Sequence, residues 1–343
     1  MEGYTLFTSD ARPKYTKDIL SVLALPEGAQ YQFRYEQAYI PSDLQHEIAS
    51  DPNKLKGLKI LIAFKSTINN NPFIVPIRWA TIRKIQRITD FYVFKFEVAN
   101  HPLSPNLITV DHICQKSIDF LSHLNNVDST LPVIKGYTDL VKPDDVKNID
   151  AWIYISRQLA LHDTFKNVHF LRVSGLYNIK KNLMKFSKDK YYICKEISFY
   201  NFTIDYYAVN YNEGNESTIH INLNSELSRL ASGSNIIMDS RYDSFKNSFQ
   251  TFEVPGNSFT EIQIHTKSSL ENHPETFVNI PITIRRANTI LLFRIITSTI
   301  GAALLAIPSL LPTASEGTKI MLIAIGALTL ALGINLIYPR NRR

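Results

Sequence analysis

Residues 295–311 read IITSTIGAALLAIPSLL, and residues 320–338 read IMLIAIGALTLALGINLIY. These two runs hold 17 and 19 residues, and neither contains a charged side chain. A helix needs roughly 20 residues to cross a hydrocarbon core about 30 Å thick. Because only helices and closed barrels satisfy their own backbone groups in lipid, the two runs predict a transmembrane helical hairpin that turns at residues 312–319.

The charges around the hairpin predict its orientation. The turn carries only Glu316 and Lys319, whereas arginines flank the open end. These arginines are Arg285, Arg286, Arg294, Arg340, Arg342 and Arg343. Basic residues remain on the cytoplasmic side, so we expect two spans of the inner (cytoplasmic) membrane with both chain ends in the cytoplasm. The alternative is a buried hairpin in a soluble core, which would have to hide two helices that are apolar on every face.

The rest of the chain has the composition of a water-soluble protein. With 343 residues, 45% hydrophobic residues and a mean hydropathy of −0.09, it is not a multi-span transporter. The roughly 285 residues before the hairpin suffice for two or three folded units. No apolar segment opens the chain, so no signal peptide is expected. Cys114 and Cys194 lie far apart in no metal or redox spacing, which favours buried thiols in a reducing cytosol.

Residues 1–104 show the alternation of apolar and polar residues that is typical of strands. Residues 31–36 alternate clearly, and residues 73–88 and 91–98 predict a long β-hairpin. The apolar parity of the long strand changes midway, which predicts a bulge or bend near Ala80. We therefore expect a small β-barrel or a strongly curved sheet in this part of the chain.

Helical periodicity at residues 109–124 and 144–165 predicts a helical region over residues 105–167. Over residues 168–286, short segments separated by Asn, Gly, Ser and Pro predict an antiparallel β-sandwich. These segments are 191–209, 218–223, 236–239, 249–254, 261–266 and 277–284. The hairpin and a basic tail occupy residues 287–343. The predicted fold class is thus a multidomain chain with a mainly β soluble head and a C-terminal two-helix transmembrane hairpin.

Cations gather in one part of this head. Residues 54–95 hold nine lysines and arginines against one acid, Asp90, and six aromatic residues stand among them. In nucleic-acid-binding proteins, basic side chains bind phosphates and aromatic rings stack on bases, so a nucleotide or oligonucleotide is the candidate ligand. The candidate ligand-binding residues are Lys59, Lys65, Arg78, Trp79, Arg83, Lys84, Arg87 and Tyr92. Alternation along the long strand predicts that Arg83 and Arg87 share a face. The same pattern also fits a hydrated polar face above an aromatic core, or a contact with the anionic membrane leaflet.

No enzyme motif is present. The chain lacks a nucleophile elbow, a Walker loop, a dinucleotide-binding glycine motif, a zinc-protease motif and a Cys-x-x-Cys pair. His162 and Asp163 are adjacent, but adjacency in sequence does not make a catalytic dyad. We therefore expect no catalytic residue, no metal site and no cofactor.

Small and polar residues recur within the hairpin at helical spacing. Ala302 and Ala306 follow Ser298 at steps of four, and Gly326 and Gly333 lie a heptad apart. Small residues let helix backbones approach closely, which predicts that hairpins self-associate into a homo-oligomer. The candidate pore or helix-packing residues are Thr297, Ser298, Ala302, Ala306, Gly326, Ala327, Ala331, Gly333 and Asn335. The hydroxyl groups of Thr297 and Ser298 either line water in such an assembly or bond to their own helix backbone.

With a basic strip at residues 54–95 and a hairpin at residues 289–338, the layout resembles bacterial antiphage membrane effectors. It is similar to the channel subunit of Hailong-type defence systems. The resemblance implies a partner nucleotidyltransferase, whose oligonucleotide or cyclic nucleotide product binds the head, and an oligomeric pore that depolarises the membrane. The ligand would either open or restrain that pore. The alternative function is a membrane-anchored β-rich scaffold or protein-interaction module without channel activity.

Overall fold

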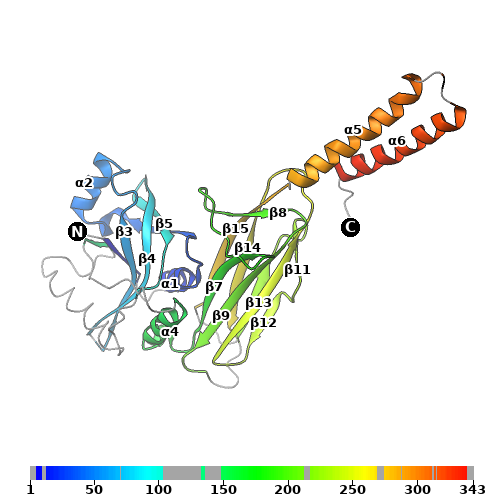
Figure 1. Cartoon of the computed structure of the whole chain (residues 1–343). Helices are drawn as coiled ribbons and strands as arrows, with labels where there is room; N and C mark the ends of the chain where they lie inside the picture. The colour runs from blue at the N-terminus through cyan, green and yellow to red at the C-terminus, as the bar shows by residue number, and fades with distance from the viewer. Residues whose placement is uncertain are drawn as a thin grey trace.

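The computed structural model describes residues 5–9, 13–69, 71–102, 133–135, 148–211, 217–268, 274–286, 288–310, 313 and 315–337. The described chain is mainly β, with largely antiparallel sheets and a pair of helices at its C-terminal end (Figure 1). This confirms the coarse fold class predicted from the sequence. The helix predicted at residues 109–124, and Cys114 within it, lie outside the described residues.

The N-terminal sheet has six strands in the order β2-β5-β4-β3-β1-β6. Its strands are β1 (Thr5–Ser9), β2 (Gln30–Glu36), β3 (Lys59–Ile68), β4 (Asn71–Ile88), β5 (Phe91–Val98) and β6 (Val133–Lys135). Within the described residues β2 and β6 are its two ends, so this unit is an open sheet. Of the two alternatives that the sequence predicted, a small β-barrel or a strongly curved sheet, the closed barrel is wrong. The sheet also reaches beyond residue 104, because β6 comes from the region predicted to be helical.

The long strand β4 is irregular at two positions. Its pairing with β3 skips Ile77, and its pairing with β5 skips Arg83. The sequence pattern indicated one irregularity near Ala80, which lies midway between them. An extra residue in one strand increases the local twist and shifts the alternation of faces, so each bulge changes which side chains point to the core.

Helix α1 (Pro13–Ala24) lies between the N-terminal sheet and the rest of the head (Figure 1). Proline suits the first position of a helix, and Pro26 follows the last turn, so both ends have a local cause. Ile19, Val22 and Leu23 are fully buried, and their spacing aligns them on one side of the helix. The other described helices of the head are α2 (Ser42–Ser50) and α4 (Asn148–Leu159), with short 3-10 turns at Gln37–Tyr39 and Asp163–Phe165.

Two sheets pack face to face to form the predicted sandwich (Figure 1). One has the order β12-β10-β14-β15-β8, and the other has the order β11-β13-β9-β7. Their strands are β7 (His169–Asn178), β8 (Tyr192–Lys195), β9 (Phe199–Ala208), β10 (Ser217–Asn222), β11 (Ser228–Leu230), β12 (Asn235–Met238), β13 (Tyr242–Thr251), β14 (Ser258–Ser268) and β15 (Phe277–Arg285). The segment predicted as one strand at residues 191–209 is divided between the two sheets. The pairing of β8 with β15 is parallel, while the other sandwich pairings are antiparallel.

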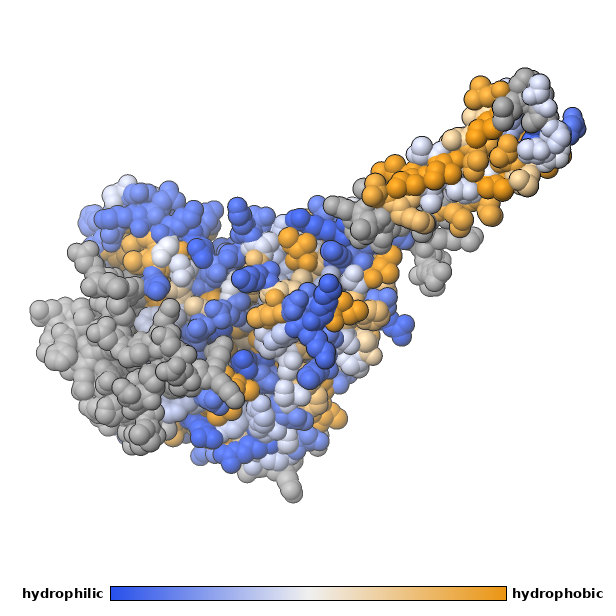
Figure 2. All heavy atoms as spheres, in the orientation of Figure 1, coloured by the Kyte–Doolittle hydropathy of each residue, from blue (hydrophilic) through white to orange (hydrophobic). Residues whose placement is uncertain are grey.

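The C-terminal pair consists of α5 (Asn288–Leu310) and α6 (Glu316–Ile337), which pack along each other and extend away from the sandwich (Figure 1). A Cβ atom on Gly301 would lie 2.4 Å from the backbone nitrogen of Leu330, so the two helices touch through this glycine. Figure 2 shows an apolar surface over this pair and a mainly hydrophilic surface over the head. Measured over the described residues, none of the helices combines the length and hydropathy of a bilayer crossing.

Candidate functional site

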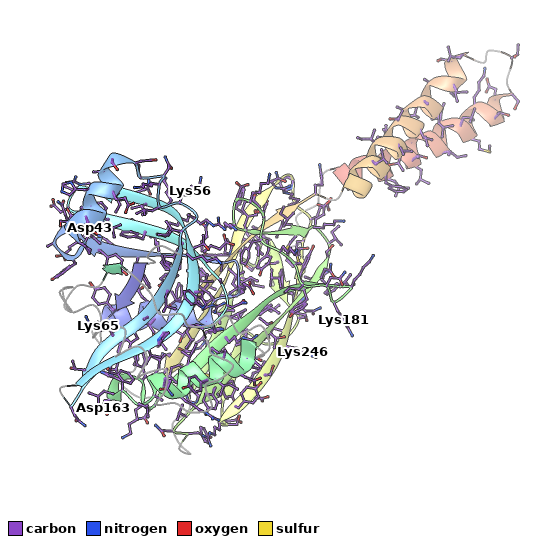
Figure 3. All side chains as sticks on the ribbon, turned by 60° about the vertical axis from the view of Figure 1, so that its left-hand side comes forward. Asp43, Lys56, Lys65, Asp163, Lys181 and Lys246 are labelled. Atoms are coloured by element: carbon purple, nitrogen blue, oxygen red, sulfur yellow. The ribbon has the colours of Figure 1, made fainter. Side chains whose placement is uncertain are left out.

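The predicted ligand-binding residues differ in exposure. The exposed ones are Lys59, Lys84 and Arg87, the half-buried ones are Lys65, Trp79 and Arg83, and the buried ones are Arg78 and Tyr92. Lys65 is six positions beyond Lys59 on β3, which corresponds to about 20 Å of strand. Figure 3 shows Lys56 and Lys65 well apart along the sheet. The basic strip is therefore not a single surface.

Arg78 belongs to the core. It is 1% exposed, and its Nη1 donates to the Leu23 carbonyl at 3.3 Å and lies 2.9 Å from His101 Nε2. Its Nε donates to the carbonyl of Ala99. Leu23 is in the last turn of α1, so the guanidinium satisfies a helix-end carbonyl and complements the helix dipole. Burial lowers the pKa of Arg78 to about 9, which leaves the side chain charged at neutral pH. Arg78 thus fastens α1 to the N-terminal sheet.

The bulge at Arg83 decides which cations share a face. Lys84 is paired with Lys95 and Arg87 is paired with Tyr92, so Lys84 and Arg87 lie on opposite faces of the sheet. Arg83 reaches Glu97, which is two residues from Lys95 and on its face. The prediction that Arg83 and Arg87 share a face is therefore wrong, because the extra residue shifts the alternation.

Glu97 lies between cations of both β units. Arg83 Nη2 is 2.7 Å from Glu97 Oε2, and Lys190 Nζ is 2.5 Å from the same oxygen. Lys190 belongs to the turn before β8, so this carboxylate ties the N-terminal sheet to the sandwich. Beside it, Lys84 and Lys95 are like charges directly opposite each other, an arrangement that destabilises a sheet unless an anion lies nearby.

A cavity of about 690 Å³ opens beside these cations, at the junction of the two β units. Its walls come from α1, β2, β5, the turn before β8, and strands β14 and β15. Three lysines and three acids line it, together with four aromatic rings. They are Lys17, Lys95, Lys190, Asp18, Asp189, Glu261, Tyr31, Tyr191, Phe259 and Phe277. The volume falls within the range of about 300–1,000 Å³ that is usual for small-molecule sites. We call this cavity the junction cleft.

The junction cleft presents lysines, carboxylates and aromatic rings to a ligand. Lys17 Nζ lies 5.5 Å from the centre of the Phe277 ring and makes no ion pair among the described residues. The Tyr31 hydroxyl donates to Asp18 at 2.8 Å, and burial together with Asp18 raises the pKa of Tyr31 well above its ordinary value. The carboxylate of Asp18, which follows Lys17 in the sequence, is thus hydrogen-bonded to Tyr31. Phe259 is largely exposed, and its ring makes an edge contact with Tyr191 that leaves part of the ring open to a base.

None of the eight candidate ligand-binding residues lines the junction cleft. Of the nine cations within residues 54–95 only Lys95 does, and the sequence pattern missed Lys17 and Lys190. Lys190 did have a signal, because the segment KKNLMKFSKDK at residues 180–190 has five lysines and one acid. Lys17 had none, since a single lysine in an amphipathic helix is ordinary. Only the docking of α1 between the two units brings it to the cleft.

The candidate residues of the hairpin fall on different sides of its helices. A Cβ atom on Gly326 would lie 2.9 Å from the backbone nitrogen of Leu305, so Gly326 belongs to the contact between α5 and α6. Thr297 Oγ1 donates to the Phe293 carbonyl at 2.9 Å, so this hydroxyl group bonds to the backbone of its own helix. Ser298 is half-buried, and Gly333 and Asn335 belong to α6. The alanines Ala302, Ala306, Ala327 and Ala331 are exposed.

Within the described residues, no group of three or more His, Cys, Asp or Glu side chains could hold a metal ion. The His162 ring lies against Phe73 and its Nε2 is 2.9 Å from Ser66 Oγ, so this histidine is packed into an aromatic cluster. Cys194 is a buried free thiol, as predicted, and burial raises its pKa to about 12.

No family model matches the chain, and no curated protein matches it. Among solved structures, it is similar to the periplasmic chaperone SfaE, with a TM-score of 0.22 and 9% identity over 27% of this chain and 53% of that chain. It is also similar to WR4, a C. elegans MSP family member, with a TM-score of 0.17 and 12% identity over 28% and 92% of the two chains. A nucleoside hydrolase-related protein from Saccharophagus degradans has a TM-score of 0.18 and 10% identity over 45% and 35%. The chain spans about half the length of the first of these structures. None of these likenesses carries an argument about fold or function.

Proposed function

We propose that this chain is a membrane effector whose C-terminal hairpin enters the cytoplasmic membrane and whose head senses an anionic ligand. The observation that supports this most strongly is the outer surface of α5 and α6. Large apolar side chains are exposed along both helices, including Leu292, Phe293, Ile300, Ile320 and Leu328. Such a surface in water forfeits the hydrophobic stabilisation that the head obtains by burial. In a lipid bilayer the same exposed apolar surface carries no such free-energy penalty.

The hairpin is joined closely to the head. Strand β15 ends at Arg285 and α5 begins at Asn288, so only residues 286 and 287 lie between them. The apolar runs continue in the sequence to Leu311 and Tyr338, beyond the described helices. With arginines at the open end, the orientation expected is a cytosolic head and an external turn. A displacement of β15 would reach α5 through a very short connection.

The ligand that best fits the junction cleft is a nucleotide or short oligonucleotide. Lys17 and Lys95 supply cations for phosphates, whereas Lys190 is already paired with Glu97, and the exposed ring of Phe259 supplies a stacking surface. Strand β15 contributes Phe277 and Ile282 to the same cavity. A ligand there would contact both β units and the strand that leads to the hairpin. It would therefore favour one arrangement of the units over another, and so open or restrain a pore.

The pore itself requires several copies, since one two-helix hairpin encloses no channel. The glycines Gly301 and Gly326 are used within the hairpin, whereas Ala302, Ala306, Ala327 and Ala331 remain exposed on its outside. Small exposed residues let neighbouring hairpins approach closely in a homo-oligomer. A nucleotidyltransferase that makes the ligand, and a role in antiphage defence, complete the proposal.

The test measures binding and ion flux on the full chain in liposomes, with short single-stranded DNA, short RNA and cyclic nucleotides as probes. Lys17→Glu with Lys95→Glu should weaken binding at least tenfold and abolish the effect of the probe on flux. The matched control is Lys166→Glu with Lys246→Glu, two exposed lysines away from the cleft. The logarithm of affinity should fall by roughly 0.7 per phosphate contact for each unit of log salt. Flux that no probe changes would contradict the sensor.

The second candidate is a membrane-anchored scaffold, and the tight seam between α5 and α6 at Gly301 and Gly326 favours it. A hairpin whose smallest residues face inward is complete as a single anchor. The two candidates differ in assembly. A strictly monomeric chain at high concentration in detergent would favour the scaffold, whereas a defined oligomer would favour the pore.

A further inference from the structure

Exposed apolar residues stand among lysines in the turn that follows β7, residues 179–190. Ile179 is 71% exposed, and Leu183 is 56% exposed although its Cδ1 lies close to Gly175 of β7. Four exposed lysines accompany them, namely Lys180, Lys181, Lys185 and Lys188. Aliphatic side chains of this size favour removal from water, and a cluster of lysines favours an anionic neighbour. The turn therefore has the chemistry of an interaction surface.

Strand pairings place this turn at the end of the sandwich from which the hairpin leaves. Asn178, the last residue of β7, is paired with Tyr200. The Tyr200 hydroxyl accepts the backbone N–H of Lys195 at 2.5 Å, and Lys195 is paired with Arg285, the last residue of β15. Since α5 begins at Asn288, the turn and the hairpin share one end of the head. Figure 3 shows Lys181 on the side of the head away from Asp163.

A second turn at this end repeats the pattern. Ile197, between β8 and β9, is exposed and has a φ of +51°. A β-branched residue rarely adopts this left-handed conformation, and glycine or asparagine is the ordinary choice there. Phe199 and Lys195 beside it are also exposed. Ile197 thus adds a further exposed aliphatic side chain beside a lysine at this end of the sandwich.

We propose that these two turns lie on the anionic leaflet through which the hairpin enters the membrane. The lysines of residues 180–188 and Lys195 contact lipid phosphates, and Ile179, Leu183 and Ile197 enter the interfacial layer. The proposal rests on the membrane insertion proposed above. Its occupant is a lipid surface because the turns are continuous with the hairpin and combine positive charge with isolated aliphatic tips. Contact at these turns fixes the tilt of the head, so that movement of β15 is passed to α5 instead of rotating the whole head.

The experiment uses the full chain in vesicles of phosphatidylcholine mixed with phosphatidylglycerol that carry a headgroup nitroxide quencher. A fluorophore is attached at Lys180→Cys or, as the control position, at Lys166→Cys near the opposite end of β7. Both are made in a Cys114→Ser background, and the native Cys194 is buried and unreactive. Quenching should be severalfold stronger at position 180 than at 166. It should weaken in high salt and in vesicles of phosphatidylcholine alone, because exposed charges are screened and the anionic lipid is absent.

A pair of variants then tests the apolar tips. Ile179→Asp with Leu183→Asp should lose most of the quenching at position 180, whereas Ile237→Asp, on β12 away from this end, should leave it unchanged. Equal quenching at positions 180 and 166 would overturn the lipid contact. Carbonate extraction of the same samples reports on the hairpin separately. If the chain resists extraction but position 180 is not quenched, the inserted hairpin is supported and the lipid contact of the turns is contradicted. If position 180 is quenched but carbonate removes the chain, the lipid contact is supported and the inserted hairpin is contradicted.

Discussion

The head and the hairpin place apolar and polar side chains in opposite positions. The head buries isoleucines and aromatic rings, and it even encloses the charged Arg78, while its lysines face outward. The hairpin turns large apolar side chains outward and keeps glycine on the inside, at Gly301 and Gly326. Hydrophobic burial therefore accounts for the fold of the head but not for the hairpin, whose two helices share only a narrow seam. The proposed insertion of the hairpin into a membrane would account for this difference between the two regions.

The largest effect expected is on the head. Arg78→Ala removes hydrogen bonds to the carbonyls of Leu23 and Ala99 and leaves a cavity beside α1. We expect a loss of about 3 kcal/mol in the free energy of unfolding of the full chain, measured by chemical denaturation in detergent. The matched control is Arg87→Ala on the same strand, which is exposed and should change stability by less than about 0.5 kcal/mol. Equal effects would mean that Arg78 lies at the surface, as the sequence first indicated.

The next effect concerns the inside of the hairpin. Gly301→Leu places a side chain where the backbone of Leu330 already lies, so α5 and α6 must separate. We expect a loss of about 1 to 3 kcal/mol in helix packing, which is typical of overpacking, and lower resistance of the hairpin to proteolysis in detergent. Gly317→Leu has no atom within 4 Å of its Cβ and should behave like the wild type. Unchanged protection of Gly301→Leu would show that the seam is not a close contact.

A smaller effect should distinguish the outside of the hairpin from its inside. Ala302 is next to Gly301 but exposed, so Ala302→Leu should leave the hairpin folded. Because the added side chain blocks close approach of neighbouring copies, detergent-extracted oligomers should dissociate. Size-exclusion chromatography with light scattering measures this, and Ala331→Leu should act in the same way. Intact oligomers in both variants would contradict assembly through these alanines.

The smallest effect is the pH dependence of the head. Burial lowers the pKa of His162 below its ordinary value of about 6.5, so the folded state binds this proton less readily than the unfolded chain. The stability that neutral His162 contributes is complete above about pH 6.5 and declines as the pH falls toward its lower folded pKa. His162→Asn should flatten this part of the profile of unfolding free energy against pH. An unchanged profile would assign the dependence to other groups.

Much of the head follows from periodicity in the sequence. Residues 31–36, 73–88 and 91–98 were predicted as strands and lie in β2, β4 and β5, because alternating burial leaves a clear period of two. The break between β8 and β9 was missed because its turn contains Ile197 at positive φ, where no glycine or proline marks a turn. The first half of β13 was missed because residues 242–246 are largely exposed and carry little apolar signal.

The site was less predictable than the fold. Counting cations cannot separate Arg78, which helix α1 encloses, from Lys84 on the surface of the same strand. The bulge at Arg83 is equally invisible, since the spacing of Ile82 and Ile85 also fits an irregularity near Ala80. The junction cleft joins α1 to strands more than two hundred residues away in sequence, so it exists only through tertiary docking.

The most direct test of the account is the accessibility of the turn between α5 and α6. A cysteine introduced at the exposed Thr313, in a Cys114→Ser background, is treated in intact cells with a membrane-impermeant maleimide. Lys166→Cys on the head serves as the internal control. If the hairpin crosses the membrane with the head inside, Thr313→Cys is labelled in intact cells and Lys166→Cys is labelled only after permeabilisation. Labelling of both positions only after permeabilisation would show that the hairpin does not cross the membrane, and would contradict the proposed function at its centre.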